Sequence, residues 1–105
     1  MARKPMRKSV SKNGKNHQPI RLRLYIAGSA PNSTIAQGNL RALCAELAGP
    51  KIEIVDVLQE PGRALRDRIM VTPTLLKLGP LPKCRVVGNL SDTAHVLASL
   101  GVTID

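Results

Sequence analysis

The feature that most restricts the fold is a pair of strand-like segments separated by one helical segment. Residues 20–26 (Ile-Arg-Leu-Arg-Leu-Tyr-Ile) alternate apolar and basic side chains with a period of two, which is typical of a strand with one face on a core. Residues 51–58 (Lys-Ile-Glu-Ile-Val-Asp-Val-Leu) are rich in β-branched residues and predict a second strand. A strand, a helix and a strand in this order indicate a βαβ unit with parallel pairing, and therefore an α/β fold.

The helix between these strands has its own start and stop signals. Residues 35–47 carry apolar side chains at helical spacing, with polar residues elsewhere. Asn32 or Ser33 is expected to cap the helix, because a short side-chain oxygen can accept hydrogen bonds from the free amides of the first turn. Gly49-Pro50 is expected to stop it, since glycine tolerates a left-handed end and proline cannot continue a helix.

The second half of the chain predicts a short helix, two strands and a last helix. Residues 63–70 form a short amphipathic helical pattern, and residues 71–78 form a third strand with Pro73 near its start. Residues 84–88 follow as a fourth strand, antiparallel to the third, and Ser91 or Asp92 is placed to cap the last helix. The apolar side chains assigned to the short helix are Ala64, Leu65, Ile69 and Met70.

The resulting order, β-α-β-α-β-β-α, is that of a thioredoxin-like α/β domain. A proline opening the third strand agrees with that fold, in which a cis proline commonly faces the loop after the first strand. Only one aromatic residue, Tyr25, is present, so the core must be built from aliphatic side chains.

The positive charge is concentrated at the amino end. Six of the sixteen Lys and Arg residues lie in residues 1–18, where there is no Asp or Glu. We interpret residues 1–19 as a flexible basic tail and residues 20–105 as the folded domain, because the tail has too few apolar residues to offset the cost of ordering. The alternative is a tail that binds nucleic acid, although the scarcity of aromatic residues argues against base stacking. With no apolar run after the basic stretch, we expect a cytoplasmic protein without a membrane segment.

Candidate chemistry is sparse. The loop where a thioredoxin carries its C-x-x-C pair reads Ser-Ala-Pro-Asn at residues 29–32, so disulfide exchange has no nucleophile there. Cys44 and Cys84 are forty residues apart and predict structural thiols, and Cys44 falls on the apolar face of its helix. His17 and His95 have no neighbours at metal-ligand spacing. We therefore predict no enzymatic activity, no metal and no cofactor.

Several short segments resemble the KaiB family in order and in spacing across residues 20–100. The resemblance implies a thioredoxin-like fold and a protein that binds the ATPase ring of KaiC in a circadian oscillator. It also implies a second, rearranged fold of the C-terminal half, which in the family assembles as a tetramer. The matching segments are residues 24–28 (Leu-Tyr-Ile-Ala-Gly), 31–33 (Pro-Asn-Ser), 54–58 (Ile-Val-Asp-Val-Leu), 71–75 (Val-Thr-Pro-Thr-Leu) and 87–92 (Val-Gly-Asn-Leu-Ser-Asp).

The residues that resemble the family's basic contact positions are Arg68, Lys77 and Arg85. We therefore expect a non-enzymatic adaptor that engages a KaiC-type ATPase or a related signalling protein, in circadian or stress regulation. A homo-oligomer, dimer or tetramer, is expected beside that partner. The chain departs from the family where residues 98–101 read Ala-Ser-Leu-Gly and where residues 64–67 lack an acidic pair, which bears on the oscillator role rather than on the fold.

Overall fold

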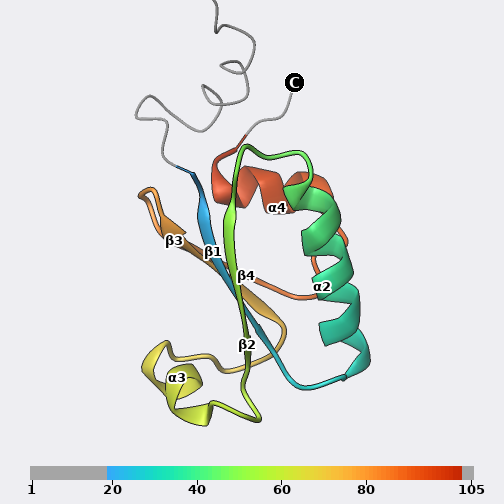
Figure 1. Ribbon diagram of the computed structural model, residues 1–105, viewed down its shortest axis with the longest axis vertical. Coiled ribbons are helices and arrows are strands. Elements are labelled where there is room, and N and C mark those ends of the chain that lie inside the picture. The colour runs from blue at the N-terminus through green and yellow to red at the C-terminus, as the bar shows by residue number, and fades with distance from the viewer. Residues whose placement is uncertain (1–18, 103–105) are drawn as a thin grey trace, which may run out of the picture.

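Four strands form one sheet in the order β2-β1-β3-β4. The computed structural model describes residues 19–102, and Figure 1 shows the sheet running through the middle of the molecule. β1 pairs in parallel with β2, whereas β3 is antiparallel to both β1 and β4. The strands are β1 (Arg21–Ile26), β2 (Lys51–Asp56), β3 (Thr74–Gly79) and β4 (Cys84–Val87).

Three helices complete the predicted order, which the structure confirms as β-α-β-α-β-β-α. α2 (Pro31–Cys44) and α4 (Thr93–Leu100) lie together on one side of the sheet, and α3 (Pro61–Arg66) lies at one end on the other side (Figure 1). The parallel β1–α2–β2 unit occupies one half of the sheet, and the β3–β4 hairpin occupies the other. This is the arrangement expected for a thioredoxin-like domain.

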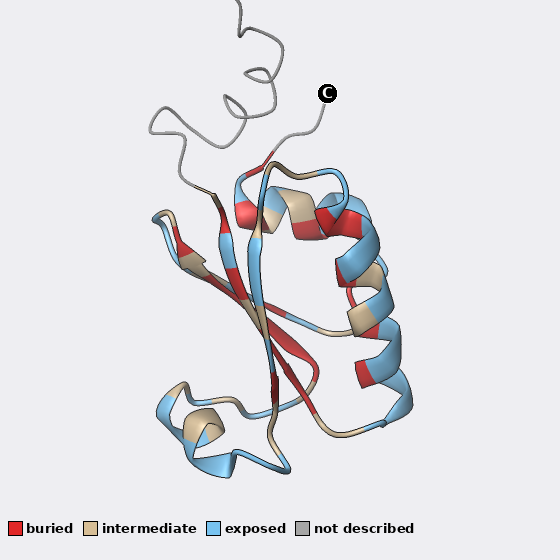
Figure 2. Ribbon diagram, viewed as in Figure 1, coloured by how far each residue is buried: buried red, intermediate tan, exposed pale blue. Residues whose placement is uncertain are grey.

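The main core lies between the sheet and the helices α2 and α4. Leu22 and Leu24 point into it from β1, as their period-two spacing requires, and Leu40 and Leu100 meet them from the two helices. All four side chains are buried, and the buried surface in Figure 2 concentrates along the strands and the inner faces of these helices. The expectation of an aliphatic core is confirmed here.

A second, much smaller core lies under α3. Its buried members are Tyr25 of β1, Val55 of β2 and Leu76 of β3. Ala64 and Ile69 pack against them from α3 and the segment that follows it. No residue of α3 itself is fully buried, so this helix contributes little apolar area to its own attachment.

Several predicted boundaries were wrong by a few residues. α2 begins at Pro31 with Ala30 as its N-cap, and neither Asn32 nor Ser33 caps it. Ser33 is instead buried, and its Oγ accepts a hydrogen bond of 3.0 Å from the Ala27 amide, which ties the loop after β1 to the helix. α2 ends at Cys44, before the Gly49-Pro50 signal, because residues 45–49 form a turn rather than another helical turn.

Two further boundaries differ in the second half. α3 spans residues 61–66 rather than 63–70, and β3 starts at Thr74 rather than at residue 71, with the Thr72–Pro73 peptide bond cis. In the last helix the prediction was right, since Asp92 Oδ1 accepts from the His95 amide at 3.1 Å. The predicted basic tail falls almost wholly in residues 1–18, which lie outside the described residues.

Candidate partner-binding site

Two of the three predicted contact residues, Arg68 and Arg85, are brought together by the fold. The guanidinium of Arg85 in β4 donates to two consecutive backbone carbonyls, that of Asp67 at 2.8 Å and that of Arg68 at 2.9 Å. Arg68 sits just after α3 with φ 55°, a left-handed conformation that is uncommon for a residue with a side chain. Arg85 therefore holds the backbone of the turn that presents the exposed Arg68 side chain.

The third predicted residue, Lys77, lies on the other side of the sheet. Successive strand residues point to opposite faces, so Lys77 faces α4 while Leu76 and Leu78 face α3. Only 6% of Lys77 is exposed, and its Nζ donates to the carbonyl of Leu100 at 2.8 Å. In this conformation its ammonium stabilises the C-terminal end of α4, where a positive charge is favourable.

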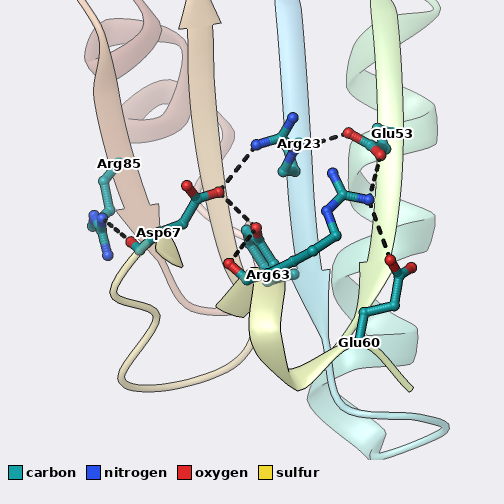
Figure 3. A network of polar contacts seen from close by, with 7 residues as sticks. Arg23, Glu53, Glu60, Arg63, Asp67 and Arg85 are labelled. Atoms are coloured by element: carbon teal, nitrogen blue, oxygen red, sulfur yellow. Dashed lines mark hydrogen bonds and ion pairs between the residues drawn. The ribbon is translucent and has the colours of Figure 1, made fainter. Parts of the chain in front are cut away.

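A network of arginines and carboxylates attaches α3 to the sheet (Figure 3). Arg23 of β1 lies at its centre, with Nε 2.8 Å from Glu53 Oε1 and Nη1 3.0 Å from Asp67 Oδ2. Arg63 of α3 contacts Glu53 Oε2 at 2.7 Å and Glu60 Oε1 at 3.5 Å. Charged groups from β1, β2 and α3 therefore replace the apolar contacts that α3 lacks.

The hydroxyl of Tyr25 completes this network from inside the small core. The hydroxyl donates a hydrogen bond to Asp67 Oδ2 at 2.6 Å, since a carboxylate is the stronger acceptor. The carbonyl oxygen of Arg63 lies 3.1 Å away. Tyr25 is fully buried, so its ring supplies apolar contact and its hydroxyl a polar link to the end of α3. The single aromatic residue of the chain thus connects the core to the candidate site.

The network also shifts the acid–base behaviour of its members. Hydrogen bonds from Arg63 and Arg23 lower the pKa of Glu53 to about 2. The hydrogen bond from Tyr25, together with that from Arg23, lowers the pKa of Asp67. Both carboxylates are therefore ionised at neutral pH, as their roles as hydrogen-bond acceptors require.

The outer side of α3 and the segment after it is apolar and basic at once. Leu65 and Met70 are 79% and 86% exposed, although both were predicted to face the core. Arg66, Arg68 and Val71 are exposed beside them, and Figure 2 shows this end of the molecule largely as exposed surface. We call these five residues the α3 surface. A run of exposed apolar side chains with charged neighbours is typical of a protein-binding site.

The described residues contain little that could carry chemistry. Burial raises the pKa of the Cys44 thiol to about 11, and burial also raises that of Cys84, so both thiols are protonated at neutral pH. Within residues 19–102 no three His, Cys, Asp or Glu side chains come close enough to hold a metal ion. In the same range there is no helix that is both long and apolar enough to span a membrane.

Comparison with known families identifies the domain. The family model described as KaiB domain matches residues 23–102, which covers all the described helices and strands except the first two residues of β1. The chain belongs to the KaiB family. The match begins within β1 and leaves the basic amino-terminal segment outside it.

Relatives within the KaiB family carry circadian clock names. The circadian clock protein KaiB3 of Synechocystis sp. is 45% identical over 85 residues, which is 79% of this chain and 83% of that protein. The circadian clock oscillator protein KaiB of Prochlorococcus marinus is 42% identical over 86 residues, 80% of this chain and 82% of that protein. Circadian regulation is thus the biological setting of the family to which this KaiB-type chain belongs.

Solved structures support the thioredoxin-like fold of this KaiB-family chain. The N-terminal domain of Synechococcus elongatus SasA aligns with a TM-score of 0.65 at 24% identity, covering 79% of this chain and 84% of that chain. Chloroplastic thioredoxin z aligns with a TM-score of 0.67 at 15% identity, covering 95% of this chain and 90% of that chain. At these identities the likeness is one of fold alone. The KaiB-family chain keeps the scaffold and has Ser-Ala-Pro-Asn at residues 29–32, without cysteine.

Proposed function

We propose that this KaiB-family chain is a non-enzymatic adaptor that engages a KaiC-type ATPase, or a related signalling protein of a clock, through the α3 surface. The observation that carries the proposal is the structure of α3 itself. A short helix with no fully buried residue is held by an ionic network, and together with the segment after it exposes Leu65, Met70 and two arginines. A helix placed in this way is well suited to present side chains to another protein.

The energetics of the α3 surface favour a protein partner. Covering an exposed side chain such as Met70 or Leu65 contributes about 1.5–3 kcal/mol each, because apolar area leaves water. Arg66 and Arg68 add positive charge at the edge of this area, which favours a partner with acidic residues and accelerates its association. The first candidate for that partner is KaiC, because the resemblance of this sequence to the KaiB family implies it.

Arg68 and Arg85 have separate roles in this proposal. Arg68 is the exposed cation that would contact the partner, and Arg85 positions the backbone from which Arg68 projects. Lys77, which the resemblance also marks as a contact position, would reach a partner only if its bond to the Leu100 carbonyl opened. We also propose a homo-oligomer, dimer or tetramer, formed through surface that is exposed in the single chain. The proposed location of the protein is the cytoplasm.

The absence of an enzymatic role is likewise proposed. It is supported by the protonated thiols of Cys44 and Cys84 and by the missing cysteine pair at residues 29–32. An insulin-reduction assay tests it directly. We expect no turnover above background with dithiothreitol as reductant, and measurable turnover would contradict the non-enzymatic role.

The binding experiment is a calorimetric titration of the full chain into the KaiC-type ATPase of the same organism, with and without ATP. We expect Arg68→Glu to weaken binding about tenfold or more, since reversing a charge in an interface costs more than removing it. Arg41→Glu is the matched control, because Arg41 is an exposed arginine on α2, at the opposite side of the sheet. Absence of binding both with and without ATP would overturn the proposed partner. Equal losses of affinity in Arg68→Glu and Arg41→Glu would overturn the proposed site.

The alternative function, nucleic-acid binding by the basic tail, is favoured by a separate observation. Six basic residues without an acidic one lie in residues 1–18. Such binding would weaken steeply with salt and disappear when residues 1–18 are deleted. Gel-shift titrations of the full and shortened chains with one duplex, at two salt concentrations, test it. Binding by the shortened chain would exclude the tail as its cause.

A further inference from the structure

The half of the sheet face not covered by α3 is hollowed on both sides of β3. A hollow of about 320 Å³ lies toward β4, lined in part by Leu76, Lys83 and Arg85. A second hollow of about 230 Å³ lies toward β2, lined in part by Arg21 and Lys51. Leu78 lines both hollows, so they lie next to each other along β3, and we call the two together the sheet groove.

Glycine at position 79 leaves room for an arginine guanidinium beside β3, at the hollow toward β2. A Cβ atom on Gly79 would be 2.8 Å from Nη2 and 3.2 Å from Nε of Arg21, so any side chain at this position would displace the guanidinium. The guanidinium of Arg21 therefore occupies the space that a side chain on β3 would fill, with Nη2 3.4 Å from the carbonyl oxygen of Leu78. The cation therefore lies beside β3 and remains exposed to solvent.

The sheet groove carries a surplus of positive charge. Its two carboxylates, Glu53 and Asp67, are already neutralised by Arg23 and Arg63. None of the ion pairs formed within residues 19–102 involves the remaining cations Arg21, Lys51 and Lys83. Among the described residues Arg85 donates to backbone carbonyls alone, and so keeps its net charge. Positive groups therefore lie on both sides of Leu78, the half-buried apolar side chain that lines both hollows.

We propose that the sheet groove binds an extended acidic segment of a partner protein, with carboxylates on Arg21 and Lys51 at one side and on Lys83 and Arg85 at the other. The apolar side chain of Leu78 suits an aliphatic side chain between those carboxylates. A nucleic acid fits less well, because single strands are bound by stacking on aromatic faces and Tyr25, the one aromatic residue, is fully buried. The sheet groove adjoins the α3 surface at Arg85, but its occupant does not depend on the clock partner proposed above.

The test uses Gly79→Ala, which leaves the formal charge unchanged and displaces the Arg21 guanidinium. The probe is a fluorescent ten-residue peptide rich in glutamate with one central leucine, titrated with the full chain by anisotropy. We expect Gly79→Ala to raise the dissociation constant about threefold to tenfold, the range expected for losing one charged contact at a partly exposed site. Arg21→Gln should give the same increase, and the double variant no further increase, because both changes remove one interaction.

Gly38→Ala is the matched control, since a Cβ at position 38 in α2 would meet no atom within 4 Å. It should leave the affinity unchanged. Thermal unfolding shows whether each variant is folded. If Gly79→Ala is not folded, the affinity of Arg21→Gln tests the proposal. Wild-type affinity in both groove variants would overturn the site. An oligothymidylate of equal charge that binds more tightly than the peptide, and is weakened equally by the two variants, would overturn the assignment to an acidic polypeptide.

Discussion

Tyr25 shows how one residue serves both the core and the candidate site. Its ring fills the small core under α3, and its hydroxyl donates to Asp67 at 2.6 Å. A buried hydroxyl without a partner would be costly, so the position of Asp67 at the end of α3 is tied to that of β1. This short hydrogen bond therefore connects the turn that presents Arg68 to the centre of the sheet, beside the bonds that Arg23 and Arg85 make to the same turn.

Tyr25→Phe should lower the free energy of unfolding by about 1.5–3 kcal/mol, the range for a buried hydrogen bond to a charged group. Urea unfolding followed by circular dichroism measures it. In an Asp67→Ala background the same substitution should cost much less, because the acceptor is already gone. Equal costs in the two backgrounds would show that the Tyr25–Asp67 bond is not what stabilises this end of the molecule.

The two thiols are predicted to react slowly and in a fixed order. Burial raises the pKa of Cys44 to about 11 and also raises that of Cys84, so little thiolate exists at pH 7.5. Alkylation by iodoacetamide, followed by mass spectrometry, should modify the half-buried Cys84 before the buried Cys44. A faster reaction at Cys44, or rates at either residue that match the urea-unfolded chain, would contradict the structural role of these residues.

At the level of elements, α3 depends on ion pairs more than on packing. It spans six residues, fewer than the ~12–15 that an isolated helix needs to be stable in water. Only Ala64 and Ile69 pack against the sheet from this region, whereas Arg63, Asp67 and Arg85 tie it by charge and hydrogen bonds. This helix should therefore respond to pH and salt more strongly than the rest of the domain.

The pH dependence has a definite direction. The folded pKa of Glu53 is about 2, below its ordinary value of 4.5, and that of Asp67 is also lowered. Their contribution to stability is therefore fully present above pH 4.5 and is lost as the pH falls toward 2. Urea unfolding between pH 7 and pH 2.5 should show this loss. Glu53→Gln should flatten the curve, while Glu46→Gln, at an exposed position beyond α2, should leave it unchanged.

The sequence predicts the order of elements well because their signals are local. Period-two alternation in residues 20–26 is enough to place Leu22 and Leu24 in the core. The helical pattern in residues 63–70 does not determine which side of this helix faces outward, because its two apolar pairs fit more than one helical face. Ala64 and Ile69 pack inward, and Leu65 and Met70 are exposed.

Long-range contacts were the least predictable part of the site. Lys77 was expected at the surface, yet its bond to Leu100 depends on where α4 ends relative to β3, which no local pattern specifies. The convergence of Arg23, Glu53 and Asp67 likewise depends on pairing across three elements. One signal was present in the sequence: the alternating arginines in residues 20–26, which place Arg23 on the face that α3 covers.

For the whole molecule, the structure shows the thioredoxin-like arrangement, and the rearranged fold implied by the KaiB resemblance stays a prediction. Residues 21–58 form a unit joined by direct strand pairing, whereas the part after Pro61 begins with a helix of weak intrinsic stability. Amide hydrogen exchange of the isolated chain should be slowest in β1 and β2 and faster after Pro61. Uniform protection with one set of amide resonances would contradict a second fold in this chain.

The central claim is that this KaiB-family chain binds its partner through the α3 surface. The most direct measurement is hydrogen exchange of the full chain, by mass spectrometry, with and without the KaiC-type ATPase of the same organism. The account predicts slower exchange on binding in residues 61–71 and unchanged exchange in α2. Slower exchange in α2, with residues 61–71 unchanged in a complex shown to be saturated, would contradict it.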